Sequence, residues 1–148
     1  MSNGPSDRIR AWRAMMHIHA TVINAIDQTL REEVGIPGAW YEALVEISLN
    51  GGAMRMNEFA QETTLTRSGA TRFADRLEEA GLVERRSCPS DRRGWELVLT
   101  EKGRTTQRAS APYVLAAIDE HFGRHIDNDE AGVLATALGR VQEALAPV

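Results

Sequence analysis

Arginines and small hydroxyl side chains gather in one segment of the chain, between residues 66 and 93. The segment holds seven arginines and no lysine, and its five acidic residues leave it with a net charge of +2. Because the whole chain carries −4, the remainder carries −6. Arginine binds phosphate or guanine through paired hydrogen bonds, and hydroxyls bond to bases or phosphates. The segment therefore favours contact with nucleic acid, although the overall charge alone argues against it.

The first part of the segment predicts an amphipathic helix whose polar face suits a DNA major groove. Thr66 is expected to cap this helix, which runs to about Ala80. The opposite, apolar face carries Ala70, Phe73 and Leu77. The polar face carries Arg67, Ser68, Thr71, Arg72, Asp75 and Arg76. A helix N-terminus attracts phosphate, and arginines beside small hydroxyls can reach base edges. For Arg76 and Arg85, a position on an ordinary solvated surface explains the charge as well as DNA contact does.

The second part of the segment predicts a β-hairpin, residues 82–99, called the wing below. Two short strand-like runs, 82–86 and 95–99, flank a loop rich in turn residues. Arg92 and Arg93 are expected at its tip, where a narrow minor groove attracts guanidinium groups, and Arg86 adds positive charge nearby. Asp91 is expected to pair with Arg93 and aim it. The single cysteine, Cys88, is expected to be an exposed thiol, with a redox role disfavoured.

Helices must hold these residues in place, and their order predicts a helix-turn-helix followed by the wing. The expected helices cover 7–34, 38–50, 56–63 with an Asn57 cap, 66–80, 101–125 with a kink or break at Pro112, and a last helix opened by an Asp127–Glu130 capping box. The first helix carries an apolar seam at alternating spacings of three and four: Ile9, Trp12, Met16, His19, Ile23, Ile26 and Leu30. Such a seam needs a partner, and a second copy of the chain is the simplest one.

The composition excludes several classes of function. No apolar run is long enough to span a bilayer, and the polar start lacks the features of a signal peptide, so a cytoplasmic protein is expected. There is no nucleophile–base pair, phosphate loop or metal-ligand set, so neither an enzyme nor a cofactor is expected. His121 and His125 have a metal-binding spacing, but no third ligand is near, and a surface pair is favoured.

The motifs resemble those of the MarR family of winged helix-turn-helix transcription regulators. The resemblance runs through 56–60, 65–68, 75–85, Asp91-Arg92-Arg93 and 99–103, and its most specific part is the D-x-R wing followed by L-T-x-x-G. It implies a mainly α-helical homodimer with a small β-hairpin wing: residues 7–34 and 101–146 dimerise, and residues 38–100 form the DNA-binding lobe. It also implies that Arg93 enters the minor groove and that Arg67, Ser68, Thr71 and Arg72 face the major groove.

The resemblance further implies a repressor on a pseudo-palindromic operator, released by a small aromatic or phenolic effector. Helix order alone suggests six residues for the effector pocket: Trp12, Met16, His19, Trp40, Tyr41 and Tyr113. Interface or core packing explains the aromatic residues and His19 more simply. The alternative function is a winged-helix protein-interaction module without specific DNA binding. The acidic remainder of the chain favours that alternative slightly, and the groove-facing arginines weigh against it.

Overall fold

The computed structural model describes residues 5–146, apart from the side chains of Pro5 and Arg92. Most of these residues are helical, and three strands form one antiparallel sheet in the order β1-β3-β2. The chain divides into two compact units. One is formed by residues 25–114, called the central unit below. The other is formed by the two chain ends, through Asn24 and from Leu115 onward, called the terminal unit.

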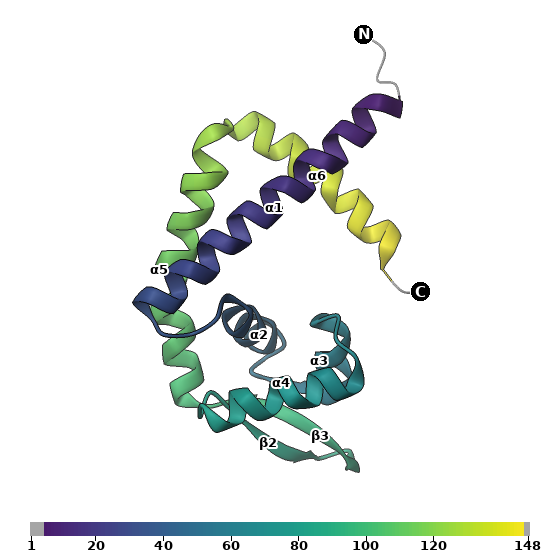
Figure 1. The fold of residues 1–148 in the computed structure, drawn as a ribbon. Helices are drawn as coiled ribbons and strands as arrows, with labels where there is room; N and C mark the ends of the chain where they lie inside the picture. The colour runs from purple at the N-terminus through teal and green to yellow at the C-terminus, as the bar shows by residue number, and fades with distance from the viewer. Residues whose placement is uncertain (1–4, 147–148) are drawn as a thin grey trace. The chain divides into compact units, whose positions relative to one another are not determined.

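The central unit contains the predicted helix-turn-helix and wing. It holds α2 (Gly38–Leu49), β1 (Ala53–Arg55), α3 (Met56–Glu62), α4 (Arg67–Glu79), β2 (Val83–Cys88) and β3 (Asp91–Leu99). The helix α4 packs against β2, and the hairpin of β2 and β3 runs alongside it (Figure 1). The mainly helical fold with a small wing is confirmed. One helix start is corrected, because α3 begins at Met56 and Asn57 therefore lies in its first turn rather than at the cap.

A single hydrophobic core joins the helices of the central unit to its sheet. Its largest fully buried members include Leu44 and Ile47 from α2, Phe59 from α3 and Leu77 from α4. The rings of Phe59 and Phe73 stack with their centroids 5.7 Å apart, which joins α3 to α4. Burial of apolar surface is the main favourable term in folding, so this core fixes the two helices relative to each other.

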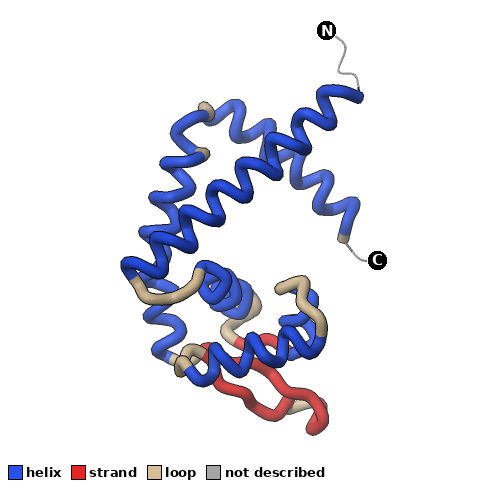
Figure 2. Tube along the Cα trace, viewed as in Figure 1, coloured by secondary structure: helices blue, strands red, loops and turns tan. Residues whose placement is uncertain are grey.

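The sheet contains a short strand, β1, that the sequence analysis did not predict. Ala53 pairs with Val98 and Arg55 with Glu96, while β2 pairs with the other edge of β3. The strands are drawn in red in Figure 2. Three residues are too few to produce a recognisable alternation of apolar and polar side chains. The strand ties the start of α3 to the base of the wing, so the wing is one part of a three-stranded sheet.

The L-T-x-x-G segment forms a tight joint between the C-terminus of α4, the wing and α5 (Glu101–His121). The Thr100 hydroxyl donates to the Gly81 carbonyl over 2.6 Å and accepts from the Gly103 amide over 3.0 Å. A Cβ at Gly103 would lie 2.1 Å from the Leu82 carbonyl oxygen, so only glycine fits. Gly81 has φ +75°, which ends α4 in the predicted left-handed cap.

The terminal unit is helical and exposes much of its apolar surface. It contains the first part of α1 (Pro5–Glu33), the last part of α5, a 3-10 turn (Gly123–His125) and α6 (Asn128–Leu145). The predicted capping box opens α6, since the Glu130 amide donates to Asp127 over 2.8 Å. Pro112 does not divide α5, and α5 ends at His121, so His121 and His125 do not share a helix. No helix within residues 5–146 is long and apolar enough to cross a membrane.

Candidate nucleic-acid interface

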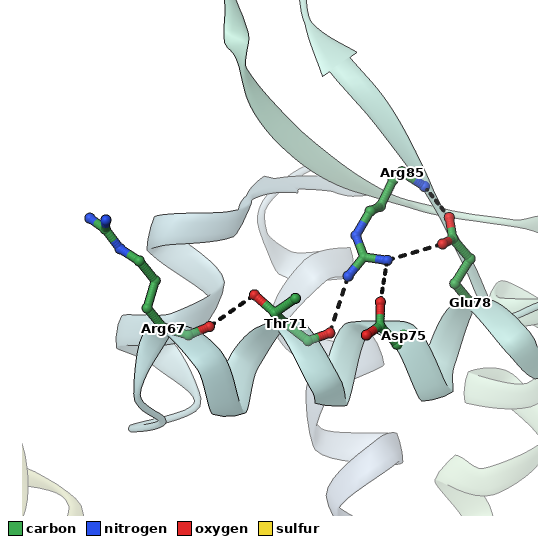
Figure 3. Close-up of polar contacts among 5 residues, drawn as sticks. All are labelled: Arg67, Thr71, Asp75, Glu78 and Arg85. Carbon is green, nitrogen blue, oxygen red and sulfur yellow. Dashed lines mark hydrogen bonds and ion pairs between the residues drawn. The ribbon is translucent and has the colours of Figure 1, made fainter.

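The helix α4 presents a continuous polar face at its N-terminal end. The Thr66 hydroxyl accepts a hydrogen bond from the Gly69 amide over 3.1 Å, which confirms the predicted cap. The side chains of Arg67, Ser68, Thr71 and Arg72 are exposed, while Ala70 and Phe73 on the other face are buried. In Figure 3 the Arg67 side chain points away from the helix axis into open space. The helix therefore offers cations and hydroxyls on one face, held by a packed opposite face.

Arg85 on β2 fixes the wing to α4 through a network of polar contacts (Figure 3). Its Nη1 lies 2.7 Å from Asp75 Oδ1 and 3.1 Å from Glu78 Oε1, and its Nη2 donates to the Thr71 carbonyl over 3.1 Å. The Arg85 amide also donates to Glu78 over 2.8 Å. With its side chain only 19% exposed, Arg85 is a structural cation and is not free to bind DNA.

The wing tip is an irregular segment braced by Asp91. The regular pairing of β2 with β3 continues to Ser87 opposite Trp95, and the next pair is Cys88 opposite Asp91. Residues 92–94 therefore bulge out of the ladder. Asp91 Oδ1 accepts a hydrogen bond from the backbone amide of Arg93 over 3.0 Å. The expected side-chain pair of Asp91 and Arg93 is thus corrected: the carboxylate orients the Arg93 backbone and leaves its exposed guanidinium available.

A groove of about 540 Å³, called the α4–wing groove below, lies between α4, the start of α3 and the wing. Its charged lining residues are Arg55, Arg67, Arg85 and Arg93 with Asp75 and Asp91, an excess of two positive charges. The remaining lining residues are Met56, Asn57, Thr71, Cys88, Gly94 and Trp95. Four of the residues expected to bind DNA therefore line one groove: Arg67, Thr71, Asp91 and Arg93. The net positive charge of the lining favours an anion in this groove.

Four other residues expected to bind DNA are not among those that line this groove: Ser68, Arg72, Arg76 and Arg86. Ser68 is exposed beside the cap, with its Oγ 3.4 Å from the Thr66 hydroxyl. The Arg76 guanidinium lies over the Phe73 ring, 5.9 Å from its centroid, and Arg86 pairs with Glu84 on the same strand. These two arginines thus have partners within the protein. The Arg92 side chain lies outside the described part of the structure.

Sequence reasoning assigned no DNA-binding role to Arg55, Asn57 or Trp95, and it misjudged Cys88. Asn57 was expected only as a helix cap, and β1 brings Arg55 to the groove, where its Nη2 lies 2.5 Å from Ser90 Oγ. Cys88 is 4% exposed, which corrects the expected exposed thiol. Cys88 pairs with Asp91 at the bulge, and its Sγ lies 3.9 Å from Ser90 Oγ.

The six residues suggested for an effector pocket are divided between the two units. Trp12 and His19 line an apolar pocket of about 590 Å³ in the terminal unit, and Met16 is exposed on the same helix. Trp40, Tyr41 and Tyr113 belong to the central unit, where Trp40 packs against the hydrophobic core. The effector pocket stays a prediction.

The short helix α3 precedes the capped helix α4, and the braced hairpin of β2 and β3 follows it, with positive charge alongside. This arrangement defines a winged helix-turn-helix protein. The sequence profile described as "MarR family" matches residues 34–94. AbsC, a MarR family transcriptional regulator from Streptomyces coelicolor, has a crystal structure similar to this chain, with a TM-score of 0.83, 32% identity and coverage of 98% of this chain and 97% of AbsC. The chain belongs to the MarR family of transcriptional regulators.

Two further similarities extend this assignment. A second MarR family regulator from Streptomyces coelicolor, solved in complex with DNA, has a TM-score of 0.83 and 27% identity over 99% of this chain and 94% of its own. The transcriptional repressor MprA of Escherichia coli is 32% identical over 109 residues. That match covers 73% of this chain and 61% of MprA.

Proposed function

We propose that the chain is a DNA-binding transcription regulator, acting as a homodimer that places α4 in the major groove and Arg93 in the minor groove. The observation that carries this proposal is the α4–wing groove. It joins Arg67 and Thr71 of the helix to Arg93 of the wing, with an excess of positive charge in a chain of net charge −4. A related regulator of the same fold was solved with DNA, which supports the same partner here.

The proposed dimer rests on the apolar surface of the terminal unit. Among its described residues only Ala117 is buried, while large apolar side chains on α1, α5 and α6 stay exposed, including Ile9, Trp12, Leu115 and Val141. The apolar pocket of this unit is lined by α1, α5 and α6 together. Exposed patches of this kind mark protein–protein contacts. A second copy supplies the same apolar surfaces, so a two-fold interface buries both.

The division of roles follows from the contacts of each residue. Arg67, Ser68, Thr71 and Arg72 are exposed near the N-terminus of α4, where bidentate arginine contacts to guanine and hydroxyl contacts to bases give sequence discrimination. Arg93 is exposed on the bulged wing tip, where its guanidinium would meet the negative potential of a narrow minor groove. Residues 7–34 and 101–146 would dimerise, while 38–100 would bind DNA.

The proposal includes repression of transcription, relieved by a small aromatic or phenolic effector. MprA is a repressor, which supports that direction of control. Its place of action is then the cytoplasm, where bacterial-type operators lie. The family comprises transcription regulators, and we infer that this chain acts by binding rather than by catalysis.

The test is a measurement of assembly state and of DNA stoichiometry. Analytical ultracentrifugation should give twice the chain mass of 16.3 kDa for the free protein. Titration of the intergenic DNA beside its own gene should saturate at two protomers per site. A monomer that binds one protomer per site would refute the dimeric operator. A dimer that binds no DNA at low salt would favour the protein-interaction module.

A further inference from the structure

An exposed tryptophan stands in the α4–wing groove where the sheet extends beyond the core. Side chains two apart on a strand share a face, so Trp95 lies on the same face of β3 as Leu97 and Leu99. Leu97 and Leu99 are buried in the core, whereas Trp95 is 53% exposed. The apolar face of the strand therefore continues past the helices that cover it and ends in an indole open to solvent.

The position of Trp95 is fixed by regular strand pairing. Ser87 lies opposite Trp95, and the bulge of residues 92–94 begins directly beyond this pair. Arg93 lies on the bulge, while Trp95 belongs to the ladder. The indole is thus attached to a hydrogen-bonded strand, which limits the conformational entropy that this segment loses when it binds a partner.

The surroundings of Trp95 favour a partner that is both anionic and apolar. Within residues 38–100, the large apolar side chains left exposed are Leu49, Leu65 and Trp95, and of these Trp95 lines the groove. Arg67 and Arg93 line the same groove. A nucleic-acid backbone alternates charged phosphates with deoxyribose rings whose faces carry C–H groups. Such a strand fits a groove that holds both arginines and an aromatic ring.

We propose that Trp95 packs on a deoxyribose of the DNA backbone strand that crosses from the major groove at α4 to the minor groove at the wing. Arg67 lies on the major-groove side of this strand and Arg93 on its minor-groove side, and Trp95 covers a sugar of the strand. This contact rests on the proposed DNA binding and adds an apolar component to it. It contributes affinity without releasing counterions, so it is independent of salt.

The salt dependence of binding separates this contact from an ionic one. Anisotropy titrations of the same operator DNA at five salt concentrations give the dissociation constant and the slope of its logarithm against log salt. Trp95→Ala should bind roughly tenfold more weakly at every salt, since it removes a half-buried aromatic contact, with an unchanged slope. Trp95→Phe should lose no more than about threefold on the same basis of apolar area. Leu49→Ala, an exposed apolar residue outside the groove, is the matched control and should bind like wild type.

Two results would overturn the proposal. One is wild-type affinity in Trp95→Ala, and the other is a loss accompanied by a slope change of about one, the value of one lost phosphate contact. If Trp95→Ala does not fold, acrylamide quenching of tryptophan fluorescence provides the test. The emission that wild type has and Trp95→Phe lacks comes from Trp95, and bound DNA should shield it from the quencher. Equal quenching with and without DNA would contradict the contact. A wild-type protein with no salt-sensitive DNA binding would instead refute the proposed function itself.

Discussion

The guanidinium of Arg85 lies 2.7 Å from the carboxylate of Asp75, and this pair joins the wing strand β2 to the exposed side of α4. Asp75 is half exposed and Arg85 largely covered, so the arginine neutralises a carboxylate on the exposed side of α4. The same guanidinium reaches Glu78 and the Thr71 carbonyl. Arg85 therefore acts as a positioning residue, holding the wing at a fixed angle to the helix.

Removing this cation should weaken both the fold and DNA binding. In a double-mutant cycle of Arg85→Met and Asp75→Asn, measured by urea unfolding, we expect a coupling of about 0.5–1 kcal/mol, the range of a partly exposed pair. Arg85→Met should also weaken DNA binding because Asp75 and Glu78 lose their counter-charge, and adding Asp75→Asn should restore part of it. A coupling energy of zero, together with no recovery of DNA binding in the double variant, would show that the Arg85–Asp75 pair does not position the helix.

Replacing Gly103 with alanine should damage the joint between α4 and α5. The new Cβ would overlap the Leu82 carbonyl oxygen at 2.1 Å, so the backbone must move. We expect a loss of about 1–3 kcal/mol in the free energy of unfolding, the usual cost of overpacking. Thr105→Ala, at an exposed position of the same helix, is the control and should be near neutral. A stable Gly103→Ala protein would mean that the joint is looser than described.

The stability of the central unit should depend on pH through Asp27. The Arg31 guanidinium, and secondly the Gly38 amide, hold the pKa of Asp27 below its usual value of 3.8. The carboxylate accepts from Arg31 over 2.7 Å and from the first residue of α2 over 2.8 Å. A lowered folded-state pKa means that the contribution is complete above the unfolded pKa and is lost as pH falls through the folded value.

Thermal melts of wild type and Asp27→Asn between pH 7 and pH 3 check this linkage. The variant should melt at a lower temperature at pH 7, and the difference should shrink as the pH falls below 3.8. An unchanging difference across this range would assign the effect to lost packing or geometry rather than to the charge.

Arg72 and Arg93 should affect DNA binding in different ways. Arg72→Ala should cost about 1–3 kcal/mol on the cognate sequence and relax the preference at one base position. Arg93→Ala should weaken cognate and scrambled DNA alike and lower the salt slope by about one. Competition with operators substituted at single positions separates the two outcomes. If Arg93→Ala bound like wild type, the wing would not enter the minor groove.

Much of the fold could be predicted because its signals are local. The hydroxyl of Thr66, the left-handed Gly81 and the Asp127–Glu130 box each act within four residues of a helix end, so composition and spacing reveal them. The wing could be predicted because the spacing of apolar residues changes after Gly81 from a helical to a strand-like pattern. The strand β1 could not be predicted in this way, because its pairing partner lies more than forty residues along the chain.

The residue types of the candidate site could be predicted, but the groups that each side chain contacts could not. Arg67 and Arg93 have the expected exposure, whereas Arg85 has the same charge and is tied to Asp75 across the α4–wing contact. Asp91 binds a backbone amide where a side-chain pair was expected. Such distinctions depend on tertiary distances, which a charge pattern does not contain. Trp95 escaped prediction because its strand face is apolar throughout, and only the end of the core exposes it.

Specific DNA binding can be measured by fluorescence anisotropy of the wild-type protein with the intergenic DNA beside its own gene. Titrations at low and physiological salt, each with excess unrelated competitor DNA, separate specific from non-specific binding. We expect tight binding that resists competitor and weakens steeply with salt, because several arginines displace counterions. No binding at low salt, or weak binding indifferent to sequence, would contradict this expectation.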